Sequence, residues 1–261
     1  MNQKAVSTRL KALQRVLRLS RRLVDRFPNT PGIPGVFVLL FFAGALDTTR
    51  DVSLLLSCGR FSLIPVGLRS LLEALANVRL LAADSENYRF LDARTLKTLL
   101  GITKYEAETL ASGRASPKVR RRQKEVAELA KTLSDRYSEL VAKKYRPLTE
   151  REKFERADML NLHLSTYQIL SMQPHHNIQN LFNRYIRVEG ENQLTATFDT
   201  KGTVEGFQYW YSMTCLMYSE LVRSVCEFFK IDVRKDLQQI TDSLRPFVRE
   251  FPADYASVAD L

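Results

Sequence analysis

Apolar residues recur at helical spacing along most of this chain, and this periodicity constrains the fold more than any other feature. Two apolar segments, 36–57 and 62–83, and an aromatic-rich segment, 204–230, predict long helices. Between Val126 and Leu140, apolar residues lie three and four positions apart, as on one face of a helix. Gly and Pro number only 10 and 9, which disfavours sandwiches and barrels with many turns. We therefore expect an all-α fold, a helical bundle.

Residues 185–199 are the one segment with the alternation typical of strands. Ile186 and Val188 alternate with polar residues before a turn-like sequence rich in Gly, Glu and Asn, and Leu194 and Phe198 alternate after it. Two such runs on either side of a short polar segment predict a hairpin. The expected fold is thus a helical bundle with one small β-hairpin near residues 185–199.

Three parts are expected along the chain. A turn-rich segment with three prolines, Phe27–Gly35, separates a basic N-terminal helix and linker (1–35) from a helical core domain (36–232), and a C-terminal helix and tail follow (233–261). The longest apolar run, Val36–Leu46, is shorter than the roughly 20 residues that cross a bilayer. We therefore expect no transmembrane segment and a cytoplasmic location.

The chain is basic, with 39 Lys and Arg against 29 Asp and Glu and a formal net charge of +10. This excess favours polyanionic partners, either RNA or another nucleic acid or an anionic membrane surface, and solubility charge is the alternative. Residues 5–27 are expected to form a basic amphipathic helix that binds a membrane, binds nucleic acid or docks on the core. A run of six basic residues without an acidic one is the predicted nucleic-acid-binding segment: Arg114, Lys118, Arg120, Arg121, Arg122 and Lys124.

Cysteine and histidine are scarce and give no metal-binding pattern. Cys58, Cys215 and Cys226 lie in apolar runs without a Cys-x-x-Cys pair, so we expect buried free thiols in a reducing compartment. The three histidines are too few and too clustered for a conventional metal site. No metal and no cofactor are expected.

A pair of charged residues, Arg69 and Glu73, lies within the Leu-rich segment 62–83. Arg69 and Glu73 are four positions apart, so they share one face of the predicted helix. A buried ion pair is a poor source of stability, because desolvation offsets the attraction. Arg69 is therefore a candidate phosphate ligand, with Glu73 orienting it or a histidine. A structural ion pair between helices is the alternative.

A second set of polar residues follows at steps of four: Tyr167, Ser171 and His175. His175 is a candidate general acid or base, and Ser171 could orient its imidazole or bind phosphate. A histidine that caps the helix C-terminus is the alternative. Because polar groups buried among apolar neighbours need partners, we predict that these residues approach Arg69 and Glu73 and form one candidate catalytic site.

The segments Leu68–Ala74 and Tyr167–His175 together resemble a bacterial all-helical family known only as a domain of unknown function. Its pattern is Arg-x-x-x-Glu followed by Tyr-x-x-x-Ser-x-x-x-His, and the resemblance extends over residues 45–230. More distantly, the chain resembles HEPN-type domains. Many of these are metal-independent ribonucleases of toxin–antitoxin, CRISPR-associated and abortive-infection systems.

The HEPN resemblance implies a role for two further residues. The HEPN signature is an arginine and a histidine on one helix, usually paired across a homodimer, and Arg156 and His163 match its spacing. The histidine would act as acid or base for attack of a ribose 2′-hydroxyl on its phosphate, and the arginine would stabilise the developing charge.

The function expected from the sequence is thus that of a HEPN-like RNA-binding or RNA-cleaving effector, implied by the resemblance to belong to a bacterial defence or toxin system. If it is an enzyme, it is a metal-independent ribonuclease. The alternative is a non-catalytic helical interaction or regulatory module whose polar motifs are structural. An open cleft around Arg69, Glu73 and His175 would favour the first reading, and a closed network the second.

Overall fold

The computed structural model describes most of the chain in two compact units. The described residues are 3–29, 32–112, 116–172, 186–189, 193–196, 204–232, 235, 238–240 and 242–244. Unit 1 comprises residues 1–83 and 154–261, and unit 2 comprises residues 84–153. This division differs from the expected parts 1–35, 36–232 and 233–261, because the N-terminal helix packs on the core and residues 84–153 form a separate body.

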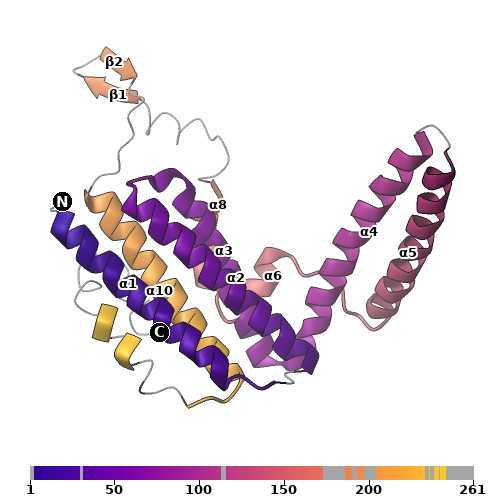
Figure 1. The fold of residues 1–261 in the computed structure, drawn as a ribbon, viewed down its shortest axis with the longest axis horizontal. Helices are drawn as coiled ribbons and strands as arrows, with labels where there is room; N and C mark the ends of the chain where they lie inside the picture. The colour runs from indigo at the N-terminus through magenta and orange to yellow at the C-terminus, as the bar shows by residue number, and fades with distance from the viewer. Residues whose placement is uncertain are drawn as a thin grey trace. The chain divides into compact units, whose positions relative to one another are not determined.

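Unit 1 is built on four long helices, α1 (Gln3–Leu23), α2 (Gly32–Ser57), α3 (Ile64–Ala83) and α10 (Val204–Phe228). Helix α3 packs against both α2 and α10, and α2 also contacts α1 (Figure 1). Leucines around α3 are almost completely buried, as its apolar sequence predicted. Short segments complete the unit: η1 (Val24–Arg26), η2 (Phe61–Leu63), α7 (Leu160–Leu162), η4 (His163–Tyr167) and α8 (Gln168–Met172).

Helices α2 and α3 approach closely at Gly67. A Cβ atom placed on Gly67 would lie 2.6 Å from Val52 Cγ2 and 3.4 Å from Thr48 Cγ2. The absence of a side chain therefore sets the spacing of the two helices at this point. Pro34 and Pro65 lie in the first turns of α2 and α3, where a missing N–H leaves no helical hydrogen bond unmade.

Unit 2 is a helical hairpin of α4 (Tyr88–Ser112) and α5 (Pro117–Ala142), preceded by η3 (Ser85–Asn87) (Figure 1). The hydroxyl of Ser116 caps α5 by accepting from the Val119 N–H. Helix α5 ends before Pro147, because Lys144 adopts a φ of 68° and the Tyr145 N–H turns back to the Leu140 carbonyl.

Helix α6 (Glu150–Arg156) begins with the capping box expected from the sequence. The Thr149 N–H donates to Glu152 Oε2 at 2.8 Å, and the Glu152 N–H donates to Thr149 Oγ1 at 3.2 Å. The hydrogen bond from Arg146, followed by those from Thr149, lowers the pKa of Glu152 to about 2. The boundary between the two units falls within this helix, after Lys153.

The predicted fold class needs one correction: the helical layers make up the fold, and no sheet is a layer of the described structure. Strands β1 (Ile186–Glu189) and β2 (Gln193–Ala196) are four residues each and pair antiparallel, with Ile186 opposite Ala196. Neither strand has a described helix among its main neighbours. The hairpin predicted over 185–199 is thus corrected to a four-residue ladder that adds no layer to the helical bundle. Phe198 lies outside the described residues.

Two segments among the described residues are long and apolar enough to cross a membrane, Gly32–Ser57 and Phe61–Ala83. The criterion rests on length and composition alone, and buried core helices of soluble proteins also meet it. The expectation that the chain has no transmembrane segment therefore stays a prediction.

Candidate functional site

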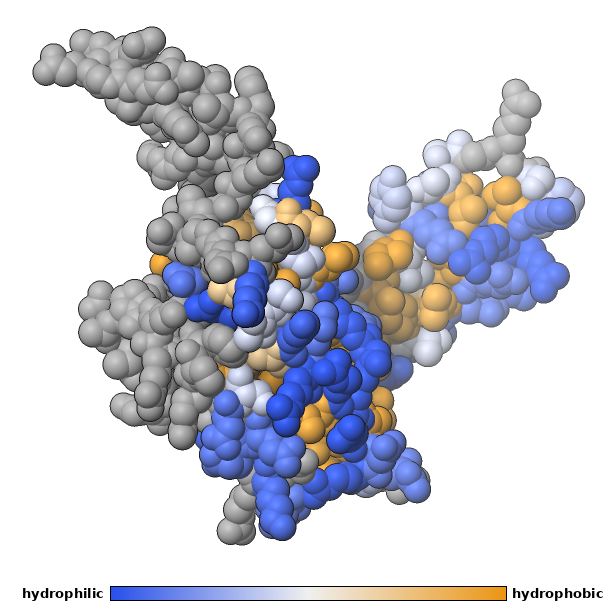
Figure 2. All heavy atoms as spheres, turned by 60° about the vertical axis from the view of Figure 1, so that its left-hand side comes forward, coloured by the Kyte–Doolittle hydropathy of each residue, from blue (hydrophilic) through white to orange (hydrophobic). Residues whose placement is uncertain are grey.

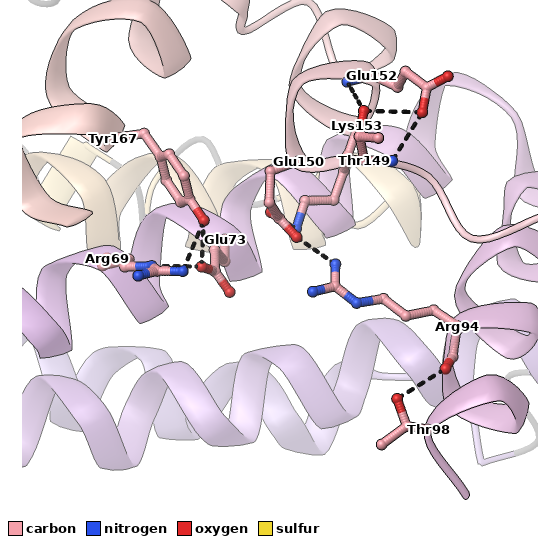
Figure 3. Close-up of polar contacts among 9 residues, drawn as sticks. All are labelled: Arg69, Glu73, Arg94, Thr98, Thr149, Glu150, Glu152, Lys153 and Tyr167. Atoms are coloured by element: carbon pink, nitrogen blue, oxygen red, sulfur yellow. Dashed lines mark hydrogen bonds and ion pairs between the residues drawn. The ribbon is translucent and has the colours of Figure 1, made fainter. Parts of the chain in front are cut away.

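Arg69, Glu73 and Tyr167 form a closed triangle of hydrogen bonds in unit 1 (Figure 3). Arg69 Nε donates to Glu73 Oε1 at 2.9 Å, and Arg69 Nη2 donates to the Tyr167 hydroxyl at 3.0 Å. The same hydroxyl donates to Glu73 Oε1 at 2.9 Å. The structure thus brings together one residue of the second sequence motif and both residues of the first, from α3 and η4.

The triangle lies at the edge of the core rather than inside it. The Arg69 and Glu73 side chains are 33% and 29% exposed, whereas Tyr167 is buried. Burial works against the charge of Arg69, but the hydrogen bond and charge of Glu73, together with Tyr167, outweigh it and raise the pKa of the guanidinium. Arg69 is therefore a permanent cation held in a fixed orientation, and its Nη1 makes no hydrogen bond within the described part of the chain.

Tyr167 is presented by an unusual turn. Residues His163–Tyr167 form a π-helical turn between the α-helical segments α7 and α8. The His163 and Tyr167 rings stack across this turn, with centroids 5.2 Å apart and planes 17° apart. The Phe154 ring, fully buried, lies 5.3 Å from His163 and 5.0 Å from Tyr167. Single π-turns inside helices are frequent at functional sites.

His163 carries an unsatisfied polar atom beside the triangle. Its Nδ1 is buried and has no hydrogen-bond partner in the described structure, while the residue as a whole is half-buried. Because a buried polar atom without a partner is costly, such atoms often mark a ligand or water position. The link between His163 and Tyr167 was not drawn from the sequence, although their spacing of four residues was a signal for it.

The expected Arg156–His163 pair on one helix is wrong. Helix α6 ends at Arg156, Asp158 takes a φ of 55°, and the Met159 N–H donates to the Phe154 carbonyl at 2.8 Å. This is a helix-terminating motif in which an Asp occupies the left-handed position usually held by Gly. His163 therefore lies on a new helical segment, and the two-turn spacing no longer places both side chains on a shared face.

Ser171 and His175 do not add to the triangle in the described structure. The Ser171 hydroxyl donates to the Tyr167 carbonyl at 2.7 Å, so its proton is used within its own helix rather than for a ligand. His175 lies outside the described residues. The roles proposed for both residues from the sequence stay predictions.

The predicted nucleic-acid-binding segment is partly neutralised by acidic neighbours. Arg122 Nε lies 2.8 Å from Glu106, and Arg121 and Lys124 pair with glutamates one helical turn away on α5. Lys118 and Arg120 are exposed and make no ion pair with a described residue, and Arg114 lies outside the described range. The absence of acidic residues in this stretch of sequence did not anticipate Glu106, which comes from α4.

The sequence analysis did not predict two further clusters of charged residues, one around Glu220 and one around Glu150. In unit 1, Glu220 of α10 binds Arg79 of α3 at 2.9 Å and also bonds Arg223. In unit 2, Glu150 bonds Arg94 and lies 2.6 Å from the almost fully buried Lys153 (Figure 3).

Burial opposes the charge of Glu150, but Lys153 and then Arg94 outweigh it and lower the pKa of the carboxyl. Arg79 and Arg94 lie far from Glu220 and Glu150 in the sequence, so no local spacing reveals these two contacts. The other two partners, Arg223 and Lys153, are three residues from their glutamates on the same helix. Within the described residues, no group of three His, Cys, Asp or Glu side chains could hold a metal ion.

The thiols correct one expectation. Cys215 and Cys226 are buried as expected, but Cys58 is exposed at the end of α2. Burial raises the pKa of the Cys215 thiol to about 12, against a smaller opposing effect of its hydrogen bond with Tyr211. The apolar run around Cys58 is a helix end, which sequence hydropathy alone does not separate from a buried segment.

Comparison with known proteins gives a family and no function. No curated protein and no solved structure matches the chain significantly. One family model, described as a family of unknown function, DUF5677, matches residues 36–194, which is more than half of the chain and contains Arg69, Glu73, His163 and Tyr167. A relationship to HEPN-type domains does not emerge from these comparisons. The chain therefore belongs to DUF5677, as the resemblance to a helical domain of unknown function had indicated at a coarser level.

Proposed function

We propose that the protein binds RNA and that the Arg69–Glu73–Tyr167 triangle holds one phosphate of the bound strand. The observation that supports this is the fixed guanidinium of Arg69, which is one-third exposed and has Nη1 unengaged. Arginine is suited to phosphate because its planar fork is rigid and its charge permanent. Here Glu73 and Tyr167 set the orientation of that fork before any ligand arrives.

His163 is the candidate for acid–base chemistry at this phosphate. Its ring stacks on Tyr167, whose hydroxyl contacts Arg69, so a phosphate on Arg69 and the imidazole belong to one neighbourhood. In a metal-independent cleavage, the imidazole would accept the proton of a ribose 2′-hydroxyl as that oxygen attacks phosphorus. The bond from phosphorus to the 5′-oxygen then breaks, the leaving oxygen takes a proton from the imidazolium or from water, and a 2′,3′-cyclic phosphate remains. A role as an effector in a defence or toxin system belongs to the same proposal and rests on the distant HEPN resemblance.

A second candidate is a non-catalytic interaction module in which the triangle is structural. The observation that favours it is that the Tyr167 hydroxyl both accepts from Arg69 and donates to Glu73, so the three groups largely satisfy one another. A closed network of this kind can fix the position of one helix against another without any ligand.

Binding of labelled single-stranded RNA by Arg69→Gln decides between the two. Loss of one charge-assisted phosphate contact, worth about 1.5–3 kcal/mol, should weaken binding by about 10–100-fold at low salt. Arg60→Gln is the matched control, because Arg60 is exposed in unit 1 and makes no ion pair in the described structure. RNA affinity that is unchanged in a folded Arg69→Gln protein would leave only the structural role.

Cleavage is tested separately from binding. His163→Gln should keep RNA affinity and lose the cyclic-phosphate product, whereas His175→Ala tests the histidine favoured by the sequence motif. If wild-type protein binds RNA without cleaving it, the site is a binding site and His163 has no catalytic role.

A further inference from the structure

Helix α1 carries a continuous basic stripe on its outer face. The helix has seven basic residues and no acidic one, and its apolar side is buried, with Leu13 and Val16 fully inaccessible. The stripe consists of exposed residues four, three and four positions apart, which places them on one face: Lys11, Arg15, Arg18 and Arg22. None of these four makes an ion pair in the described structure, unlike Arg121, Arg122 and Lys124 of α5.

Exposed aliphatic side chains lie where α1 gives way to α2. Val24 of η1 is 47% exposed, and Ile33, Val36 and Leu40 on the first turns of α2 are 60%, 47% and 63% exposed. The spacing of the last three puts them on one side of the helix. Figure 1 shows the end of α1 and the start of α2 at the same end of unit 1, where the chain connects them. Figure 2 brings the α1 side forward and shows apolar residues exposed among hydrophilic ones.

We propose that this end of unit 1, formed by α1, η1 and the first turns of α2, binds the surface of an anionic lipid membrane. The arginines would lie at the headgroups, and Ile33, Val36 and Leu40 would enter the boundary of the acyl chains. The aliphatic residues decide between a membrane and a nucleic acid. Side chains of this kind gain nothing from phosphates in water, whereas they gain free energy on leaving water for lipid.

Vesicle sedimentation with the full chain tests the charge. Wild-type protein should sediment with phosphatidylcholine vesicles that contain about one-third phosphatidylserine and much less with phosphatidylcholine alone. Each basic residue near an anionic surface strengthens membrane partitioning by about five- to tenfold. The triple variant Arg15→Gln, Arg18→Gln and Arg22→Gln should therefore weaken partitioning by about 100-fold. The control variant removes three positive charges from exposed residues of α5 that also make no ion pair in the described structure: Lys118→Gln, Arg120→Gln and Lys131→Gln.

A second variant tests the aliphatic residues. Ile33→Ser with Leu40→Ser leaves the charge unchanged and should still weaken partitioning at least tenfold, because the buried apolar area is lost. Both variants replace exposed side chains, and circular dichroism checks that the helices persist. The proposal is overturned if anionic vesicles do not bind the protein, if the α5 control loses as much binding as the α1 variant, or if the serine variant binds like wild type. RNA binding that depends on the three arginines, without vesicle binding, would reassign the stripe to nucleic acid.

Discussion

Replacing Tyr167 by Phe should weaken the polar triangle and leave the packing of the ring in place. The change deletes one hydroxyl that accepts from Arg69 Nη2 and donates to Glu73 Oε1. Two buried hydrogen bonds to charged groups would contribute about 3–6 kcal/mol. Arg69 and Glu73 are about one-third exposed and keep their direct bond, so water replaces part of the loss. We expect unit 1 to lose about 2 kcal/mol of stability.

Urea unfolding followed by tryptophan fluorescence measures this loss. Trp210 is the only tryptophan of the chain and lies in α10, so its signal reports on unit 1. A loss of about 2 kcal/mol lowers the urea midpoint by about 1 M at an ordinary slope. Tyr105→Phe is the control, because it deletes an exposed hydroxyl of α4. It should change neither the urea midpoint measured by fluorescence nor the midpoint measured by circular dichroism. A Tyr167→Phe midpoint equal to wild type would show that the triangle contributes nothing to stability.

Three other outcomes follow from particular contacts. Gly67→Ala should destabilise unit 1 by about 1–3 kcal/mol in urea unfolding, because its methyl group would meet Val52 at 2.6 Å, whereas Gly44→Ala, with nothing within 4 Å, should be neutral or stabilising. A thiol reagent should modify only Cys58 in the native protein and all three cysteines in denaturant. Because the folded pKa of Glu152 is about 2, below its unfolded value, the stability that it contributes is present above about pH 5 and is lost as the pH falls towards 2. The difference in unfolding between wild type and Glu152→Gln, followed by ellipticity, should shrink over that interval.

The helices were predictable because their signals are local. Apolar periodicity and a first-turn proline located α3 to within two residues at each end, and the aromatic-rich segment matched α10. The division into two units was not predictable in the same way. It depends on which helices share a core, and the apolar spacing between Val126 and Leu140 carries no information about which distant helices pack against this segment.

For the site, the sequence predicted the contact of Arg69 with Glu73 from helix geometry, and the approach of Tyr167 from the requirement that buried polar groups have partners. Arg69 and Glu73 meet because residues four apart on a helix face each other, and this prediction is confirmed. That Tyr167 would join them followed only from the need of a buried polar group for a partner. Ser171 did not join them, because the hydroxyl of a serine in a helix can donate to the carbonyl four residues earlier, here that of Tyr167.

The break after Arg156 changes which residues can act together. An arginine and a histidine seven positions apart share a face only on an unbroken helix. The helix is interrupted at Asp158, and no Gly or Pro in the sequence between Arg156 and His163 indicates this break. Burial of Phe154 and Met159 on either side of the turn favours the left-handed residue between them, an effect of tertiary packing that local propensity does not contain. Once the helix is broken, the π-turn brings His163 against Tyr167 and so into the neighbourhood of Arg69. The histidine is therefore associated with an arginine nearly one hundred residues earlier in the chain, whose orientation is already fixed by Glu73, rather than with the one that the HEPN spacing selects.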